Sequence, residues 1–241
     1  MRILLINPNT TDSVTALVAQ HVGANARASA EFISVTGRFG ARYISTRASA
    51  AIAAHAALDA YATHGTGCNA VYLACFGDPG LLALREVADI PVVGMAEASC
   101  LAAAQRGRFA IVTGGALWGP MLTEFVASIG LADKLTGVRT IAPTGGEIAT
   151  NPDAALAALA KACTACATED GAETVILGGA ALAGLAERIQ PNVAVPVLCS
   201  VAAGTRAVIA AAKRQRDDTA PPPPLESTGL SAELTTLLQR K

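Results

Sequence analysis

Residues 70–94 read AVYLACFGDPGLLALREVADIPVVG, and this stretch decides the class of fold. The apolar residues from Ala70 to Ala74 predict a buried strand. A turn rich in Gly, Asp and Pro follows, and a helical segment then leads to a second short strand at Val92–Gly94. A strand, a helix and a second strand in this order are typical of a parallel sheet, so the stretch predicts an α/β fold.

The same pattern occurs a second time in the chain. Residues 174–199 read TVILGGAALAGLAERIQPNVAVPVLC and match residues 70–94 with one residue inserted before the second strand. Residues 108–115, RFAIVTGG, likewise match residues 2–9, RILLINPN. An internal repeat of this kind indicates two homologous units. We therefore expect two pseudo-symmetric lobes, each a mainly parallel sheet flanked by helices.

Strands and helices are expected to alternate along the whole chain. Short apolar runs predict strands at Ile3–Ile6, Ala70–Ala74, Val92–Gly94, Phe109–Val112, Thr174–Leu177 and Val195–Cys199. Longer Ala-rich segments predict helices at Thr11–Val22, Ser49–His64, Gly119–Ile129 and Asn151–Cys166.

The repeat also suggests how the chain divides into lobes. We expect residues 1–98, together with about 200–214, to form the first lobe and residues 99–199 to form the second. The tail, residues 215–241, is expected to contain a polyproline II spacer at Pro221–Pro224. A short helix that begins at Ser231 is expected to follow it.

The arrangement of the lobes predicts where a ligand binds. In an open parallel sheet the carboxyl ends of the strands carry the ligand, and two facing lobes would enclose it between those ends. The repeat therefore predicts an active-site cleft between the lobes. Its expected lining is Asn7–Thr10 and Cys75–Asp78 from the first lobe, and Thr113–Gly115 and Gly178–Ala180 from the second.

Composition excludes several classes of function. Of the 241 residues, 52% are hydrophobic and 15% are charged, so the chain can bury a large core. The net charge of −1 and the scattered Lys and Arg residues leave no basic face for nucleic acid. The first apolar run is too short for a signal peptide, and no apolar run is long enough for a membrane span. We expect a soluble, cytoplasmic protein whose six cysteines are reduced thiols.

Cys75 is the leading candidate for a catalytic side chain. It follows a strand and precedes a Gly-rich turn, where backbone N–H groups and a helix dipole would lower the pKa of the thiol. Most free cysteines are instead small buried hydrophobic residues. The expected cleft favours the functional interpretation. The repeat aligns Cys75 with Gly179, so the second lobe has no equivalent thiol.

Other candidate sites are weaker. Cys163 and Cys166 have the spacing of redox and zinc sites, but they lie in an Ala-rich segment with no second pair, which favours helix packing. The Gly-rich turns lack the spacing of a dinucleotide-binding loop. Asp78 either caps the helix that follows its turn, which we favour, or orients the turn. His55 and His64 are interpreted as surface or packing residues.

Several motifs together resemble a known family. These are INPNT at Ile6–Thr10, GARYIST at Gly40–Thr46, ACFGDPGL at Ala74–Leu81, VVGMAEA at Val92–Ala98 and LGGAALAGLA at Leu177–Ala186. Their order and spacing, over about residues 1–212, resemble the aspartate/glutamate racemase superfamily and within it the hydantoin and allantoin racemase branch. The resemblance implies a cofactor-independent isomerase without a metal. In that family one cysteine thiolate removes a proton from a carbon next to a carbonyl, and a second cysteine returns a proton on the opposite face.

The resemblance also assigns residues. It implies that Cys75 is the first catalytic cysteine and that Asn7 contacts the substrate. Ser45 and Thr46 fall in the segment that lines the pocket, and Thr113 falls where the second lobe supplies polar contacts. The further expected substrate-binding residues are Asn9, Phe76, Gly77, Gly114, Gly179 and Ala180. The family more often has a hydroxyl residue where this chain has Gly114.

Gly179 is the most important difference between this chain and the family pattern. It falls on the second catalytic cysteine of the family, so the chain lacks an evident second acid. Cys199 ends a neighbouring strand and is a weaker candidate to replace it. The residues around Gly179 also differ from the usual family context at several positions, which favours natural divergence over an introduced substitution.

The expected function is that of a racemase or epimerase in which Cys75 transfers a proton at a carbon next to a carbonyl. The substrate is expected to be a hydantoin-like or amino-acid-like small molecule with a carbonyl or carboxylate, and the protein is expected to form homo-oligomers. Two alternatives stay open. One is a single-cysteine decarboxylase or isomerase of the same superfamily, although arylmalonate decarboxylases keep the cysteine of the other lobe. The other is a protein that binds a small molecule without catalysis.

Overall fold

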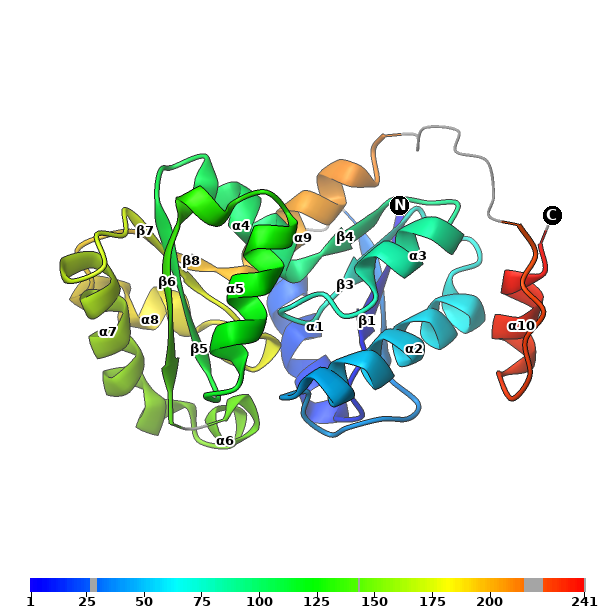
Figure 1. Cartoon of the computed structure of the whole chain (residues 1–241), viewed down its shortest axis with the longest axis horizontal. Coiled ribbons are helices and arrows are strands. Elements are labelled where there is room, and N and C mark those ends of the chain that lie inside the picture. The colour runs from blue at the N-terminus through cyan, green and yellow to red at the C-terminus, as the bar shows by residue number, and fades with distance from the viewer. Residues whose placement is uncertain (27–29, 143, 215–222, 241) are drawn as a thin grey trace.

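The computed structural model describes residues 1–26, 30–142, 144–214 and 223–240, and it contains two four-stranded parallel sheets. The strand orders are β2-β1-β3-β4 and β6-β5-β7-β8, so the second sheet repeats the first. The strands are β1 (Arg2–Asn7), β2 (Glu31–Thr36), β3 (Ala70–Leu73), β4 (Val92–Gly94), β5 (Phe109–Gly114), β6 (Leu135–Ile141), β7 (Thr174–Leu177) and β8 (Val197–Cys199). Figure 1 shows the two sheets side by side, and the predicted two-lobe α/β fold is confirmed.

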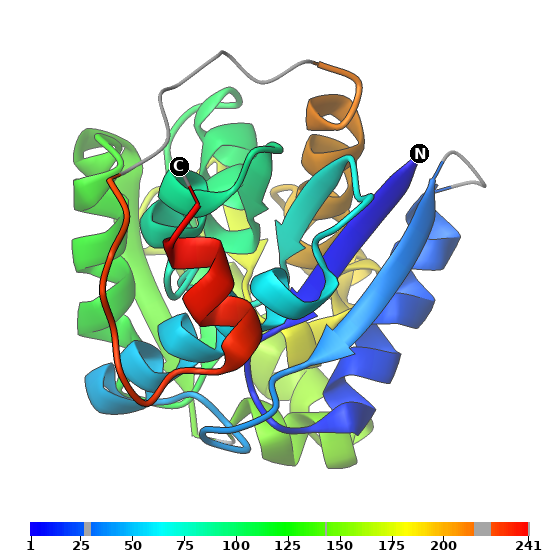
Figure 2. The ribbon, with the colours of Figure 1, turned by 90° about the vertical axis from the view of Figure 1, so that its right-hand side faces the viewer.

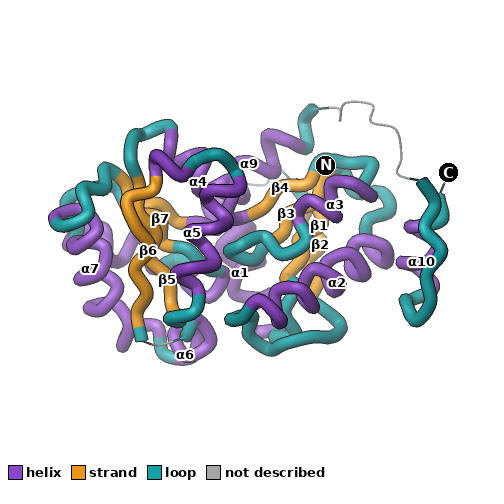
Figure 3. Tube along the Cα trace, viewed as in Figure 1, coloured by secondary structure: helices purple, strands orange, loops and turns teal. Residues whose placement is uncertain are grey.

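Helices flank both sheets, as Figure 3 shows in purple around the orange strands. The longer helices are α1 (Asp12–Ala26), α2 (Arg47–His64), α4 (Met95–Ala104), α5 (Trp118–Ser128), α7 (Pro152–Thr168) and α9 (Ser200–Ala211). The shorter helices are α3 (Leu81–Val87), α6 (Gly145–Thr150), α8 (Leu185–Ile189) and α10 (Ala232–Leu238), with 3-10 turns at Ala132–Lys134, Ala180–Leu182 and Gln190–Asn192.

The helix starts have local causes that the sequence shows. Thr46 caps α2, because its hydroxyl accepts from the backbone N–H of Ser49 and the Ser49 hydroxyl bonds back to the Thr46 N–H. Pro152 occupies the first position of α7, where a missing N–H costs nothing. The four predicted helices and six predicted strands are all present, with shifts of a few residues at their ends.

Two helices exchange between the lobes. α4 follows β4 of the first sheet but packs against β5, β7 and β8 of the second, whereas α9 follows β8 and packs against α1, β3 and β4 of the first. α4 and α9 also pack against each other, between the two sheets in Figure 1. The exchange ties the lobes together. The lobe boundaries near residues 98 and 199 stay a prediction.

The core lies on both faces of the central strands. Every residue of β3 and β7 is buried, and the residues of β1 from Ile3 to Asn7 are buried as well. The edge strands β2 and β6 are mostly half-buried, and both were absent from the sequence-based prediction. Polar and apolar residues are mixed in both strands, so they lack the continuous apolar run that marks the central strands.

The C-terminal helix packs on the outside of the first lobe. Figure 2 shows α10 in red in front of α2, and the two helices are in contact. Leu234 and Leu237 are buried against the apolar cluster beneath α2, and the Ser231 hydroxyl caps the helix by accepting from the Leu234 N–H. Half of the predicted polyproline segment, Pro221 and Pro222, lies outside the described residues. Among the helices that the structure describes, none is long and apolar enough to cross a membrane.

Candidate active site

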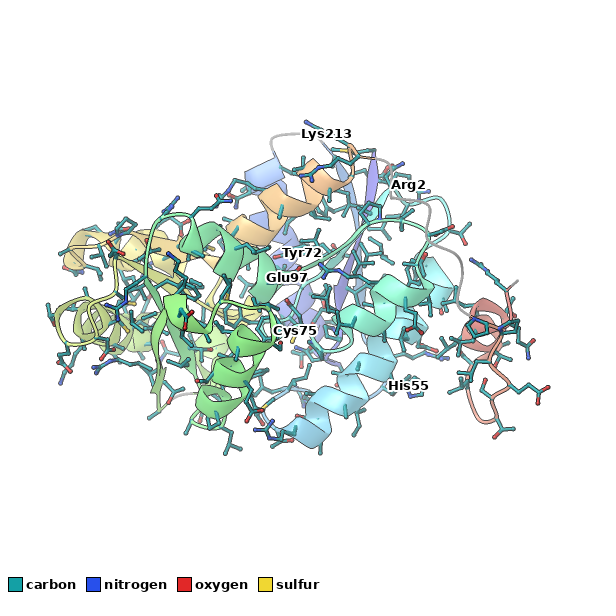
Figure 4. All side chains as sticks on the ribbon, turned by 45° about the horizontal axis from the view of Figure 1, so that its top comes forward. Arg2, His55, Tyr72, Cys75, Glu97 and Lys213 are labelled. Atoms are coloured by element: carbon teal, nitrogen blue, oxygen red, sulfur yellow. The ribbon has the colours of Figure 1, made fainter. Side chains whose placement is uncertain are left out.

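A narrow cavity lies between the lobes, at the carboxyl ends of β1, β3, β5 and β7. Its volume is about 40 Å³. Its lining consists of Asn7, Asn9, Val14, Tyr43, Ile44, Ala74, Cys75, Phe76, Thr113, Gly114, Trp118, Gly178, Gly179, Ala180, Ala181 and Leu182. Figure 4 shows Cys75 in the middle of the molecule, where the two lobes meet.

Most of the residues expected at the site lie in this lining. The cavity brings together Asn7, Asn9, Cys75, Phe76, Thr113, Gly114, Gly179 and Ala180. Ser45, Thr46 and Gly77 are not among the lining residues. Thr46 and Ser45 take part in the cap of α2, where the Ser45 N–H donates to the Ser49 hydroxyl.

Tyr43, Ile44, Trp118, Val14, Ala181 and Leu182 were not predicted but line the cavity. Tyr43 and Ile44 belong to the GARYIST motif, in which Ser45 and Thr46 were the residues expected to line the pocket. The Tyr43 hydroxyl reaches across to the second lobe and donates to the carbonyl oxygen of Gly114 at 3.4 Å. Trp118 opens α5 and gave no local signal, because its approach to the site depends on the packing of the two lobes.

Aromatic side chains of each lobe pack on a glycine of the other. The Phe76 ring of the first lobe lies against Gly178 of the second, where a Cβ atom would collide with it. The Trp118 ring of the second lobe lies over Gly77 of the first, and a Cβ atom at Gly77 would come within 2.6 Å of Trp118 Cζ3. These close approaches require glycine at both positions and give the cavity apolar walls.

Asn7 is fully buried, and its side chain is already engaged. Its amide Nδ2 donates to Asn9 Oδ1 and to the Thr15 hydroxyl, both at 2.9 Å, and its Oδ1 accepts from the Asn9 N–H at 3.3 Å. Asn9 in turn accepts from the Thr11 N–H at 2.9 Å. This network shapes the loop between β1 and α1. The part of Asn7 that faces the cavity is therefore held rigidly.

Thr113 is the residue that the repeat aligns with Asn7, and its surroundings differ. It is 5% exposed, and its hydroxyl has no hydrogen-bond partner among the described residues. A Cβ atom built on Gly179 would lie 3.8 Å from Thr113 Oγ1 and 3.5 Å from Leu182 Cγ. The Thr113 hydroxyl thus lies next to the space that a side chain at residue 179 would enter.

Gly179 has a φ angle of 141°, a conformation that L residues rarely adopt. Its N–H donates to the buried hydroxyl of Ser200 at 3.2 Å, which fixes the loop at the start of α9. That N–H is therefore occupied. The N–H groups of Phe76 and Ala180, one from each lobe, have no acceptor within the described chain, so they are available to an oxygen atom in the cavity.

The expected lowering of the Cys75 pKa is wrong for this structure. The thiol is 8% exposed, and burial raises its pKa well above the usual range, with a smaller increase from the nearby Asp78 carboxyl. The helix after the turn does not offset this effect, because α3 begins only at Leu81 and has seven residues. The thiol of the ligand-free protein is therefore protonated at neutral pH.

The prediction that Asp78 caps the helix after its own turn is also wrong. α3 has Gly80 at its N-cap and no side-chain cap. The Asp78 carboxylate instead accepts from the backbone N–H groups of Ala96 at 2.9 Å and Glu97 at 2.8 Å, in the first turn of α4. Asp78 therefore anchors the Cys75 loop to a helix that packs on the second lobe.

Burial makes Asp78 an unusual carboxyl group. It raises the pKa to about 7, against the opposite effect of the two N–H donors and of Arg85. Arg85 itself forms an ion pair with Glu97 beside the cap. Gly94 leaves the room for Asp78, because a Cβ atom there would collide with the carboxylate. The anchor is thus built from several residues of the first lobe.

The remaining candidates lie away from the cavity. Cys199 is not among the lining residues, so the structure does not bring it to the site. Cys163 and Cys166 are buried in α7, as expected for packing residues. His55 packs edge-on against Phe39, with ring centroids 4.8 Å apart. In the described parts of the chain, no group of His, Cys, Asp and Glu residues could hold a metal ion.

The cavity lining contains no charged side chain among its described residues. Its polar groups are the Asn7 and Asn9 amides, the Tyr43 and Thr113 hydroxyls and the Cys75 thiol. Burying an unpaired charge is strongly unfavourable, so a cavity of this kind favours a neutral ligand. The thiol is the group best suited to remove a proton, because the amides and the aliphatic hydroxyl are far weaker acids and the Tyr43 hydroxyl donates to the Gly114 carbonyl.

Comparison with known proteins identifies relatives over most of the chain. A family model described as Asp/Glu/Hydantoin racemase matches residues 3–208. The hydantoin racemase of Pseudomonas sp. (strain NS671) is 32% identical over 208 residues, which cover 86% of this chain and 84% of the relative. The hydantoin racemase of Paenarthrobacter aurescens is also 32% identical, over 211 residues that cover 86% of this chain and 89% of the relative.

Solved structures agree with these relatives. The allantoin racemase from Pseudomonas fluorescens has a TM-score of 0.90 and 29% identity, and the match covers 95% of this chain and 100% of that one. The allantoin racemase from Klebsiella pneumoniae has a TM-score of 0.84 and 30% identity, with 98% of each chain covered. Arylmalonate decarboxylase, with a TM-score of 0.60 and 19% identity over 88% of this chain and 92% of that one, shares the fold.

Proposed function

Because the chain belongs to the Asp/Glu/Hydantoin racemase family and is a racemase in the isomerase class, we propose that it racemises a neutral, hydantoin-like ring with Cys75 as a proton-transferring thiol. The observation that carries the proposal is the cavity between the lobes, which contains the Cys75 thiol and no charged side chain. A cyclic ureide brings carbonyl and N–H groups but no fixed charge, so it matches this lining.

The same lining disfavours free amino acids as substrates. Their ammonium and carboxylate groups would need buried counter-charges, and the described lining offers none. A dicarboxylate, the kind of substrate that an arylmalonate decarboxylase takes, meets the same difficulty. The decarboxylase alternative is therefore less well supported than racemisation of a neutral ring.

In the proposed mechanism the Cys75 thiolate removes the proton from the ring carbon next to the carbonyl. The electron pair of the broken C–H bond moves into the carbonyl and forms an enolate. We assign the stabilisation of the enolate oxygen, which is usually the largest contribution to such reactions, to the N–H groups of Phe76 and Ala180, because both residues line the cavity and neither N–H has an acceptor in the described chain. A raised pKa makes the Cys75 thiolate scarce but also makes it a strong base for a weak carbon acid.

The test compares two substrates, and it compares the wild type with two cysteine variants. An enantiopure 5-substituted hydantoin and, separately, L-glutamate are incubated with the protein, and optical rotation is followed with time. We expect rotation to decay with the hydantoin only. Cys75→Ala should reduce the rate by about a thousandfold, within the usual contribution of a general base, while the circular dichroism spectrum is retained.

Cys199→Ala is the matched control, because it removes a thiol at the end of β8 that does not line the cavity. It should racemise the hydantoin at the wild-type rate. Full activity in Cys75→Ala would refute the role of Cys75. Tight binding of the hydantoin without any decay of rotation in the wild type would favour the binding-protein alternative.

A further inference from the structure

We propose that the Thr113 hydroxyl, together with a water molecule held beside Gly179, delivers the proton on the face of the substrate opposite Cys75. This inference rests on the proposed function, because it concerns the second proton of the same reaction. Racemisation needs a proton donor on each face of the planar enolate. Cys75 serves one face, and its repeat partner, Gly179, has no side chain to serve the other.

Thr113 lies next to Gly179 in the second lobe. Thr113 is the next-to-last residue of β5, which pairs with β7, and the carboxyl end of β7 leads into Gly178 and Gly179. The 3.8 Å distance from Thr113 Oγ1 to a Cβ atom built on Gly179 is an ordinary van der Waals contact. The nearest atoms to that Cβ position are those of Leu182, at 3.5 and 3.6 Å, so a group of about methyl size fits beside Gly179 in ordinary contact with Leu182 and Thr113. The hydroxyl therefore lines the space in which a side chain at residue 179 would lie.

The hydroxyl of Thr113 is free to bind a ligand or a water molecule. The Thr113 hydroxyl has no hydrogen-bond partner among the described residues, and it is not one of the fully buried unpaired polar atoms, so its oxygen is open to the cavity. Its equivalent in the first lobe, Asn7, is engaged by Asn9 and Thr15. An unpaired hydroxyl that borders a cavity is suited to hold a water molecule, which needs polar partners in a space at least its own size.

The other groups of the lining are less suited. The Asn7 and Asn9 amides do not release protons at neutral pH. Tyr43 is a stronger acid than Thr113, but its hydroxyl donates to the Gly114 carbonyl across the lobes. Thr113 is thus the hydroxyl that is both unpaired and next to Gly179.

The proton balance of the step is complete. The Cys75 thiolate takes the proton from the substrate carbon and becomes a thiol. Water bound to Thr113 gives a proton to the opposite face of the enolate carbon, a new C–H bond forms, and hydroxide remains. Once the product has left, the Cys75 thiol releases its proton to solvent and the hydroxide takes a proton from solvent, which restores the thiolate and the water. No oxidant or cofactor is consumed.

The experiment measures two rates in one reaction. An enantiopure 5-substituted hydantoin is incubated with the protein in D2O, loss of the C5 proton signal reports exchange, and optical rotation reports inversion. The ratio of inversion to exchange is compared in the wild type, Thr113→Val, Thr113→Ser and Gly179→Ala. Thr140→Val is the matched control, because Thr140 is the register partner of Thr113 on β6 and does not line the cavity.

We expect the ratio to fall at least tenfold in Thr113→Val, to recover to within threefold of the wild type in Thr113→Ser and to stay unchanged in Thr140→Val. Gly179→Ala should also lower the ratio, because its methyl group would occupy the space assigned to the water; since an L residue is strained at this φ angle of 141°, the ratio and not the absolute rate is compared. Circular dichroism and melting curves check that each variant is folded.

An unchanged ratio in both Thr113→Val and Gly179→Ala would overturn the proposal, and so would a fall in Tyr43→Phe alone. Exchange without inversion in the wild type would overturn this inference and leave the role of Cys75 intact. Absence of exchange in the wild type, or full exchange in Cys75→Ala, would instead refute the proposed function on which it rests.

Discussion

The two loops that meet at the cavity follow similar paths but differ in how they are held. The loop from Cys75 to Gly80 and the loop from Gly179 to Gly184 both end in a left-handed glycine before a short helix, with φ angles of 83° at Gly80 and 79° at Gly184. The first loop is anchored by Asp78 to the start of α4. The second has Leu182 at the aligned position, and its helix α9 has no side-chain cap.

The strand ends show the same contrast. In the first lobe Asn7 is fixed by several hydrogen bonds, and the Cys75 thiol lines the same cavity. In the second lobe Thr113 offers an unpaired hydroxyl, and Gly179 leaves room for a group of about methyl size where the first lobe has the Cys75 side chain. The comparison shows that the two halves of a duplicated fold keep the same backbone path while the side chains at the ends of their strands differ. Each of the following predictions tests one side of this contrast.

The largest expected effect concerns the first loop and the ionisation of Cys75. Because burial raises the pKa of this thiol, the thiolate fraction should keep rising with pH beyond the range in which free cysteine is already ionised. Alkylation by iodoacetamide should therefore increase about tenfold per pH unit, or about a hundredfold from pH 7 to pH 9. Mass spectrometry of the Cys75 peptide, with free cysteine as reference, measures this increase. A plateau below pH 8 would show that the loop lowers the pKa.

A smaller effect is expected from the anchor of the same loop. Asp78→Ala removes two hydrogen bonds to α4, and we expect the free energy of unfolding to fall by about 2 kcal/mol, the usual range for a lost cap in a buried site. Urea unfolding at pH 8 measures the change. Asp78→Asn, which keeps one acceptor oxygen, should lose less. Equal stability of Asp78→Ala and the wild type would mean that the first loop is held no more tightly than the second.

Much of the fold could be predicted from the sequence. The central strands are short apolar runs, and the internal repeat shows that one arrangement occurs twice. The edge strands β2 and β6 were missed because their half-buried residues mix polar and apolar types. The exchange of α4 and α9 between the lobes depends on packing that no local pattern reveals.

Part of the site could also be predicted from the order of the strands. The carboxyl ends of parallel strands meet at one edge, so Asn7, Cys75, Thr113 and Gly179 could be assigned to one cleft. Trp118 and Tyr43 reach the cavity across the lobes, which the sequence does not show. The Asp78 cap and the raised pKa of Cys75 were misjudged because local sequence gives neither the distant helix nor the degree of burial.

The most direct test of the account is whether the two faces of the substrate are chemically unequal. Each pure enantiomer of a 5-substituted hydantoin is incubated separately with the wild-type protein in D2O, and proton exchange at C5 and inversion are followed together. The account predicts that exchange exceeds inversion for one enantiomer only, because a single thiol can return deuterium to the face it deprotonated. The same ratio from both enantiomers would contradict it, since that result requires equivalent groups in the two lobes.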